Sequence, residues 1–243
     1  MMLIDTRQRS NEPEIMDDFN MEGEILRDAL DKIASINRLL GGNKVTTAGL
    51  KFLLRGIDPV RPIRILDVGC GNGDMLRSLA DYGIKQGYNF QLNGIDANAF
   101  TVRHAASLSV SYPNIQYICG DIFHEIKQTG PYDVLLCTLT LHHFKETEIV
   151  NLLTDFKAKS NLGIIINDLH RSAIAYYLFM ALCFVFRLNQ MSRDDGLISI
   201  LRGFKSEDLR HYSRKLNLTQ YHIRWKWAFR YQWIIKTAEE PGI

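Results

Sequence analysis

Ile63-Arg-Ile-Leu-Asp-Val-Gly-Cys-Gly-Asn-Gly-Asp74 is the stretch of sequence on which the fold depends. Its first half is an apolar run typical of a buried strand, and a helical pattern begins directly after three alternating glycines. Without a Cβ, Gly69, Gly71 and Gly73 let the backbone take positive φ and let a ligand come close. The first turn of the helix points unpaired N–H groups at the same place. We therefore predict a strand–loop–helix unit that binds a small ligand.

The spacing of these glycines argues against a dinucleotide. The dinucleotide fingerprint has its third glycine at the sixth position of the loop, where this chain has Asp74. Asp67 and Asp74 flank the loop, and two further carboxylates, Asp96 and Asp121, end later apolar strands. Four carboxylates at one site repel a pyrophosphate. They suit a ligand with a positive charge, an amino group and ribose hydroxyls.

Residues 67–73, Asp-Val-Gly-Cys-Gly-Asn-Gly, resemble the first motif of the class I S-adenosylmethionine-dependent methyltransferases, and later motifs follow in the family's order. The resemblance covers roughly residues 61–235, and the chain is similar in particular to bacterial small-molecule methyltransferases of the ubiquinone/menaquinone-methylase-like group. It implies S-adenosyl-L-methionine as cofactor and a Rossmann-like, doubly wound, mostly parallel seven-stranded sheet with an antiparallel last strand. The resemblance assigns these residues to the cofactor: Asp67, Gly69, Cys70, Gly71, Gly73, Asp96, Ala97, Asp121, Ile122, Thr138 and Leu139.

Two of the acids at strand ends have specific expected roles. Asp96 follows the apolar stretch 91–95, and a carboxylate there accepts two hydrogen bonds from ribose hydroxyls; the alternative is a cap for the next helix. In the family the second acid, Asp121, meets the adenine amino group while Ile122 packs on the ring. An Asp at a strand end is also a common turn residue.

The composition is that of an ordinary globular domain. Of 243 residues, 46% are hydrophobic and 23% charged, so the chain can bury a full core. A net charge of +2 gives no general attraction to nucleic acid or membrane, although the part from residue 171 onward is basic. Four scattered cysteines lack the spacing of a zinc site and read as buried, reduced thiols, so we expect no metal. Residues 1–20 carry no signal-peptide core, and we expect a cytoplasmic protein.

We expect an N-terminal helical cap over residues 1–60 and the methyltransferase domain over residues 61–243, together one structural unit. Spacing predicts a helix over 22–40 that Gly41-Gly42 stops, and a second from Thr46 or Thr47. In similar methyltransferases such a pair covers the cofactor and helps to close the substrate pocket. Asn37 and Arg38 are then candidate substrate contacts; the alternative is that both helices pack on the sheet without touching a ligand.

The fourth predicted strand, 132–138, leads into Leu139-Thr-Leu-His-His-Phe144. The resemblance places Leu139 beside the methionine part of the cofactor and His142 and His143 in a loop that faces the substrate. The segment lacks the Asn/Asp-Pro-Pro-aromatic tetrad of amino-methylating enzymes that act on bases, and Cys137 lies inside an apolar strand rather than in a Pro-Cys setting. Both observations argue against DNA as substrate.

The fifth predicted strand, 163–168, ends in a group of polar residues at the sheet edge where open α/β sheets bind ligands. They are Asn167, Asp168, His170 and Arg171. His142, His143 and His170 are the candidate bases, because a phenol with a pKa of about 10 calls for a base and histidine titrates near 6.5. The alternative is structural: Asn167 and Asp168 cap the next helix, and Arg171 pairs with Asp168.

A helical lid is expected over about 172–205. Residues 173–186 are fourteen consecutive apolar residues, which as a helix span about 21 Å and fall short of the roughly 30 Å of a bilayer core. We expect this helix to be buried or to line an apolar pocket with Tyr176. Residues 193–203 are expected to form a loop, from which Arg202 either fixes an acidic substrate group or stays at the surface. The aromatic-rich stretches 218–227 and 229–235 read as the last two strands, with core and surface faces.

The sequence therefore predicts methyl transfer from S-adenosylmethionine to a small apolar or aromatic acceptor, with O-methylation favoured and C-methylation open. Peripheral membrane contact remains open, as does the choice between monomer and homodimer. Two other classes remain as alternatives: an RNA methyltransferase, suggested by the basic C-terminal third, and a cofactor-binding protein without catalysis.

Overall fold

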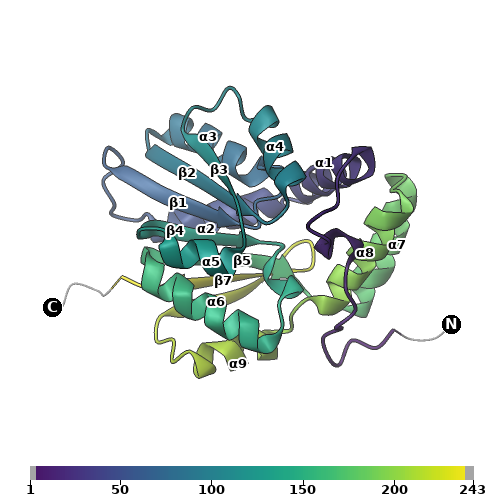
Figure 1. Ribbon diagram of the computed structural model, residues 1–243. Helices are drawn as coiled ribbons and strands as arrows, with labels where there is room; N and C mark the ends of the chain where they lie inside the picture. Colours follow the sequence, from purple (N-terminus) through teal and green to yellow (C-terminus); the bar gives the residue numbers. More distant parts are fainter. Residues whose placement is uncertain (1–3, 239–243) are drawn as a thin grey trace.

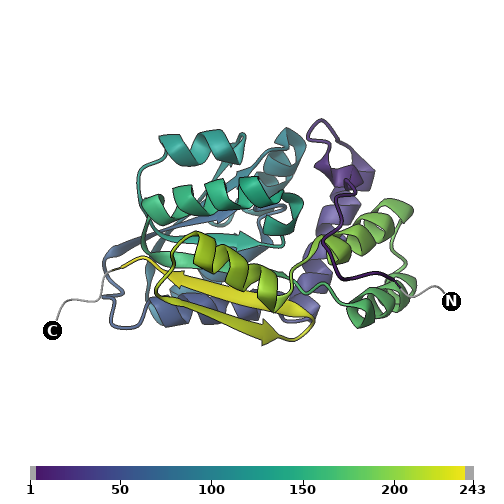
Figure 2. The same cartoon turned by 90° about the horizontal axis from the view of Figure 1, so that it is seen from below.

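The computed structural model describes residues 4–238 and contains one seven-stranded sheet with helices on both faces (Figures 1 and 2). The strand order is β3-β2-β1-β4-β5-β7-β6; β1 to β5 are parallel, and β7 is antiparallel to both its neighbours. This confirms the predicted fold class. The strands are β1 Pro62–Val68, β2 Asn89–Asp96, β3 Ile115–Cys119, β4 Tyr132–Thr138, β5 Ser160–Leu169, β6 Tyr221–Lys226 and β7 Arg230–Lys236.

The direction of strand addition reverses between β1 and β4, which pair in parallel in the middle of the sheet. Both strands are apolar almost throughout, because helices cover both faces, and hydrophobic side chains such as Leu66 and Leu136 are fully buried. In open α/β sheets a ligand binds beyond the carboxyl ends of the strands at such a reversal. The glycine loop lies at this point.

Four α-helices connect the parallel strands. Their bounds are α3 Asp74–Gln86, α4 Ala99–Leu108, α5 Ile122–Gln128 and α6 Glu146–Lys159, with α9 Ser206–Lys215 before β6. The side chain of Asn98, not that of Asp96, caps α4 by accepting a hydrogen bond from the Thr101 N–H. The carboxylate of Asp96 is therefore left for other partners.

The N-terminal part contains a short 3-10 helix η1 (Ile15–Asp17) and helices α1 (Glu24–Leu39) and α2 (Gly42–Leu53). The expected start of α2 at Thr46 or Thr47 is wrong. A left-handed residue, Gly41 at φ 79°, turns the chain so sharply that α2 starts at Gly42. Thr46 lies inside α2, and its hydroxyl is 3.2 Å from that of Thr138 at the end of β4.

Two expectations about the lid are wrong. The expected loop over residues 193–203 is helical as far as residue 202, because it belongs to α8 (Gln190–Arg202), which Gly203 caps. The apolar helix α7 (Ala173–Val185) packs on α8 with one face only, and several of its large side chains are exposed. Phe184 is 88% exposed and Val185 73%. Figure 1 shows α7 and α8 beside α1 at one end of the sheet. No helix within residues 4–238 has the length and apolar character needed to cross a membrane.

Candidate functional site

The glycine loop between β1 and α3 needs glycine at its first and third positions for steric reasons. Gly69 (φ 68°) and Gly73 (φ 77°) are left-handed, and added Cβ atoms would lie 2.3 Å from Thr140 and 2.0 Å from the Tyr117 hydroxyl. Gly71 (φ 52°) differs, because nothing lies within 4 Å of the place of its missing Cβ. The loop therefore leaves open space over Gly71, where a ligand can approach the backbone.

Two carboxylates lie next to the glycine loop. Asp67 is fully buried, and its Oδ1 has no hydrogen-bond partner. Burial, with the neighbouring charge of Asp96, raises the pKa of Asp67 to about 8. Asp96 is held in place by the N–H groups of Gly71 (3.1 Å) and Asn98 (3.0 Å), and burial raises its pKa as well. Two buried carboxylates without a cation favour a positively charged ligand.

The other residues expected at the cofactor lie along the same sheet edge. Cys70 is buried, and burial next to Asp96 raises the pKa of its thiol. Leu139 takes a positive φ of 54° and donates its N–H to the Asn167 carbonyl at 2.9 Å, which binds the end of β4 to β5. Ala97, Ile122 and Thr138 are half-buried at or next to strand ends, whereas Asp121 is exposed and caps α5 through the Phe123 N–H.

Helix α1 lies across the glycine loop. Asp31 accepts a hydrogen bond from the Asn72 amide at 2.9 Å and lies 2.8 Å from the His104 ring. One residue before the end of α1, Arg38 forms an ion pair with Asp74, the first residue of α3. The candidate substrate residue Arg38 is thus engaged in closing the loop. In this structure the N-terminal part covers the site.

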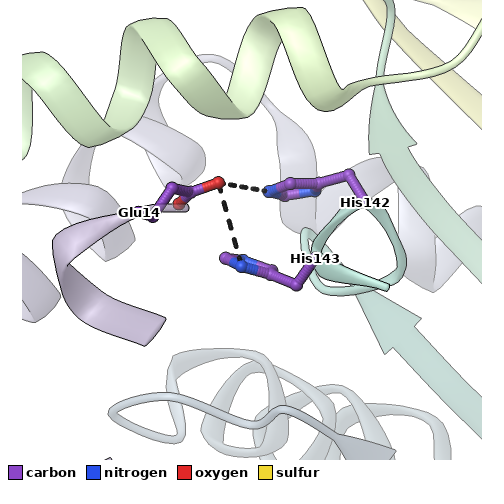
Figure 3. A group of neighbouring side chains, drawn as sticks. All are labelled: Glu14, His142 and His143. Carbon is purple, nitrogen blue, oxygen red and sulfur yellow. Dashed lines mark ion pairs between the residues drawn. The ribbon is translucent and has the colours of Figure 1, made fainter. Parts of the chain in front are cut away.

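A second polar group gathers around His142, in the 3-10 helix η2 (Leu141–His143) after β4 (Figure 3). The His142 Nδ1 is 2.7 Å from Asp168 Oδ1, and its Nε2 faces Glu14 Oε1 at 3.6 Å. Neither Nε2 nor Oε1 has a hydrogen-bond partner, and both residues are buried. Burial raises the pKa of Glu14 to about 7, although His143 and Arg202 lower it. Sequence reasoning missed Glu14, because no local motif links it to a histidine so far along the chain.

The neighbouring residue His143 belongs to the same group. Its Nδ1 lies 2.7 Å from Asp17, and Asp17 also binds Arg202 at 2.7 Å. These two hydrogen bonds outweigh burial and lower the pKa of Asp17. Arg202, expected to bind substrate or lie at the surface, is instead buried, and it also donates to the carbonyls of His142 and His143.

The ligand atoms of Glu14, His142 and His143 lie within 4.8 Å of one another, a combination that suits a divalent metal. However, Asp17 already occupies His143 Nδ1, and the cation of Arg202 lies 3.6 Å from Glu14 Oε1. A divalent ion would have to displace Asp17 from His143 and would lie close to the positive charge of Arg202. We therefore interpret the group as a proton-sharing network.

The remaining candidates lie apart from this network. His170 accepts a hydrogen bond from the Trp225 indole N–H at 3.2 Å and contacts the ring of Tyr231, and burial lowers its pKa. Arg171 is buried and pairs with Asp208 at 2.9 Å; the expectation that it pairs with Asp168 is wrong. Tyr176 packs edge-on against Tyr177 within α7.

Two asparagines, the last of the candidate substrate residues, lie at the junction of α1, α2 and β5. Asn167 is fully buried and donates to the Gly42 carbonyl and the Thr46 hydroxyl, both at 3.0 Å. Asn37, also buried, donates to Asn43 at 2.7 Å. The structure thus brings both asparagines to the carboxyl end of β5, close to Asp168.

Residues 65–159 match the family model of the methyltransferase domain. A ubiquinone biosynthesis O-methyltransferase of Albidiferax ferrireducens is 28% identical over 171 residues, which are 68% of this chain and 64% of the relative. The enzyme of the same name from Rickettsia canadensis is 31% identical over 123 residues, 49% of this chain and 48% of the relative. Both matches span less than two thirds of the relative's length.

Solved structures show the same fold. The plantazolicin methyltransferase BpumL in complex with SAH has a TM-score of 0.65 at 17% identity and matches 85% of this chain and 88% of its own. The magnesium protoporphyrin IX methyltransferase (ChlM) from Synechocystis PCC 6803 with bound SAH has a TM-score of 0.56 at 14% identity, with 90% of each chain matched. The resemblance stated from the motifs is confirmed at the level of domain and fold.

Proposed function

We propose that the chain, whose residues 65–159 match the family model of the methyltransferase domain, is an S-adenosylmethionine-dependent methyltransferase that methylates an oxygen of a small hydrophobic or aromatic acceptor. The observation that carries this proposal is the unpaired, buried carboxylate of Asp67 beside Asp96, which accepts the N–H of Gly71 where the loop is open. A cationic nucleoside supplies the missing charge there. A phosphate would add to the repulsion.

The residues present suit this cofactor. Asp67 Oδ1 is free to bind the ammonium group, and Asp96, oriented by the Gly71 and Asn98 N–H groups, has further lone pairs for ribose hydroxyls. When bound, S-adenosylmethionine supplies an electrophilic methyl group on a sulfonium. The chain then has to align donor and acceptor and exclude water, and alignment alone can lower the barrier by roughly 7 kcal/mol or more. Helix α1 across the loop provides the exclusion.

We assign removal of the acceptor proton to the Glu14–His142 pair. Asp168 fixes the imidazole of His142 with the proton on Nδ1, which leaves Nε2 as the proton acceptor. Glu14 faces that nitrogen, and its raised pKa of about 7 suits proton exchange near neutral pH. His170 takes no part in this step, because its partners are on β6 and at Tyr231 on β7.

An oxygen acceptor is supported by two points. The curated relatives are named for O-methylation in ubiquinone biosynthesis. A hydroxyl on an aromatic ring also needs the kind of base that the Glu14–His142 pair offers, since its pKa is about 10. The acceptor is therefore proposed to be a hydroxylated ring of the quinol or phenol type.

The test has two stages. Calorimetry with SAH at pH 8 should show binding that Asp96→Ala weakens by about tenfold or more. A panel of catechols and hydroxyquinones is then incubated with S-adenosylmethionine, and products are detected by mass spectrometry. His142→Gln should lower turnover by about 100-fold or more, while the matched control His211→Gln, an exposed histidine on α9, should not. Absence of SAH binding would overturn the cofactor assignment, and binding with transfer only to RNA would overturn the acceptor class.

A further inference from the structure

Arg230, the first residue of β7, is a buried cation without adequate partners. It is 3% exposed, and its Nε and Nη1 have no hydrogen-bond acceptor. Burial lowers its pKa to about 10, and Asp168 provides the compensating charge from the adjacent strand. A buried guanidinium normally has its donors satisfied. The two unpaired donors of Arg230 are therefore candidates to bind a ligand that accepts hydrogen bonds.

Two unpaired acceptors lie in the same region, namely the Oδ1 atoms of Asn37 and Asn167. Hydrogen bonds fix both amide orientations. The Asn167 Nδ2 donates to the Gly42 carbonyl, which cannot donate, so its Oδ1 must point elsewhere. Asn43 donates its own Nδ2 to the carboxylate of Asp74, so its oxygen receives the Asn37 amide and leaves Asn37 Oδ1 free.

These atoms converge on Gly42. A Cβ added there would lie 1.9 Å from Asn37 Oδ1 and 2.8 Å from Arg230 Nη1, so both unpaired atoms lie over this glycine. The Gly42 carbonyl holds the amide of Asn167 at 3.0 Å. Donors and acceptors are thus gathered at one place, where a side chain on residue 42 would displace them.

The position of this group relates it to the transfer site. Asn167 accepts the Leu139 N–H at the end of β4, and the next residue, Asp168, orients His142. Asn167 and Asp168 are consecutive on β5, so their side chains leave opposite faces of the sheet, and the group and the proposed proton-transfer pair flank the carboxyl end of this strand from its two faces. The group does not overlap with Asp67 and Asp96, which the cofactor requires.

We propose that Arg230, Asn37 and Asn167 form the subsite for the polar end of the methyl acceptor. Arg230 donates to an anionic or carbonyl oxygen, and an amide oxygen of Asn37 or Asn167 accepts from a neighbouring hydroxyl. The acceptor class is then an aromatic ring with a hydroxyl next to a carboxylate, phenolate or carbonyl oxygen. This inference rests on the proposed function, because it names the substrate of that same site.

Access requires movement of the corner between α1 and α2. Arg230 is closed off in this structure, and the corner, Leu40 to Gly42, lies next to it. Gly41 is left-handed, with open space around the place of its missing Cβ, so an outward movement of the corner breaks the hydrogen bond from Asn167 to the Gly42 carbonyl but meets no packing at Gly41.

The experiment uses the full chain saturated with SAH and measures the binding of small aromatic probes by ligand-observed NMR. The probes are 2-hydroxybenzoate, which carries a carboxylate next to a hydroxyl, and phenol. Wild type should bind 2-hydroxybenzoate at least about tenfold more tightly than phenol. Arg230→Met should remove this preference and leave SAH affinity within about twofold. The matched control Arg224→Met, an exposed arginine on β6, should retain the preference.

Thermal unfolding separates binding from a structural role. Because Nε and Nη1 of Arg230 have no acceptor and Asp168 keeps its contact with His142, loss of the guanidinium should leave the melting temperature of Arg230→Met unchanged or higher. A fall of more than about 5 °C would show that Arg230 serves the fold, and the proposal would be overturned. Asn37→Leu should reduce the preference for 2-hydroxybenzoate over benzoate, and an unchanged preference would remove Asn37 from the subsite.

The outcomes also separate the subsite from the proposed function. If SAH binds but wild type shows no preference for 2-hydroxybenzoate, or if Arg230→Met keeps it, the subsite is overturned while the methyltransferase assignment stands. If SAH does not bind, the proposed function falls and the subsite falls with it.

Discussion

The substitution Asp67→Asn should make the unliganded protein more stable, and by an amount that depends on pH. The pKa of Asp67 is about 8 in the folded chain, compared with the ordinary value of 3.8 that we take for the unfolded chain. A carboxyl group with a raised folded pKa costs no stability below the unfolded pKa. Above it, the unfolded state ionises while the folded state holds its proton, so stability falls by about 1.4 kcal/mol per pH unit until the folded pKa is reached.

At pH 7 the cost of keeping Asp67 is therefore about 4 kcal/mol. Because the carboxylate is fully buried, solvent screening does not reduce this figure much. The asparagine variant should match wild type near pH 4 and exceed its free energy of unfolding progressively up to pH 8. Urea unfolding across this range measures the difference, and Asp81→Asn, an exposed carboxylate on α3, is the matched control.

The same group should make cofactor binding depend on pH in the opposite sense. Below pH 8 Asp67 must lose a proton before it can bind an ammonium group, so SAH affinity should rise by about tenfold per pH unit from pH 6 to 8. The asparagine variant should bind weakly and without this slope. Parallel stability curves for variant and wild type would refute the reasoning, because they would show that Asp67 is not held protonated by burial and Asp96.

The other predictions concern proton transfer, packing and the surface of α7. Glu14→Gln should lower O-methylation by about 100-fold or more and should avoid the loss of up to about 3 kcal/mol of stability that wild type undergoes between pH 4.5 and 7; unchanged turnover would take Glu14 out of the network. His170→Ala should keep turnover at pH 7 within about threefold, and a much larger loss would identify it as the base. Gly163→Ala should destabilise by about 1–3 kcal/mol in urea unfolding, since its Cβ would lie 2.4 Å from the Ile235 carbonyl; an unchanged midpoint would contradict this. Phe184→Glu should change the unfolding free energy by less than about 0.5 kcal/mol, and a large loss would show that this exposed ring is covered in solution.

Local signals in the sequence were sufficient for the sheet and the cofactor side of the site. Gly69, Gly71 and Gly73 follow a buried strand, and the strand-end acids Asp67 and Asp96 are brought together because parallel strands end at the same edge. These features depend on residues that are close in the chain and on the pairing of strands. Both produce a periodic pattern of apolar residues that can be read in the sequence.

The parts that could not be predicted depend on tertiary packing. Asp194-Asp195-Gly196 looks like a helix breaker, yet α8 continues through it, because Asp195 accepts the N–H groups of Ile15 and Met16 and Gly196 lies against Phe179. Glu14, in the N-terminal part, faces His142 after β4. Arg230, in the C-terminal part, pairs with Leu169 at the end of β5. Neither has a spacing pattern that could reveal these contacts.

The position of α1 has a consequence for the rate of turnover. If the nucleoside binds at the glycine loop as proposed, its departure requires this helix to lift from the loop. The contacts that hold the helix there are polar, from Asp31 and Arg38. Asp31 and Arg38 are partly exposed, so added electrolyte weakens their attraction. Opening should therefore become more frequent as ionic strength rises, and if product departure limits the cycle, moderate salt should accelerate the proposed methyl transfer rather than inhibit it.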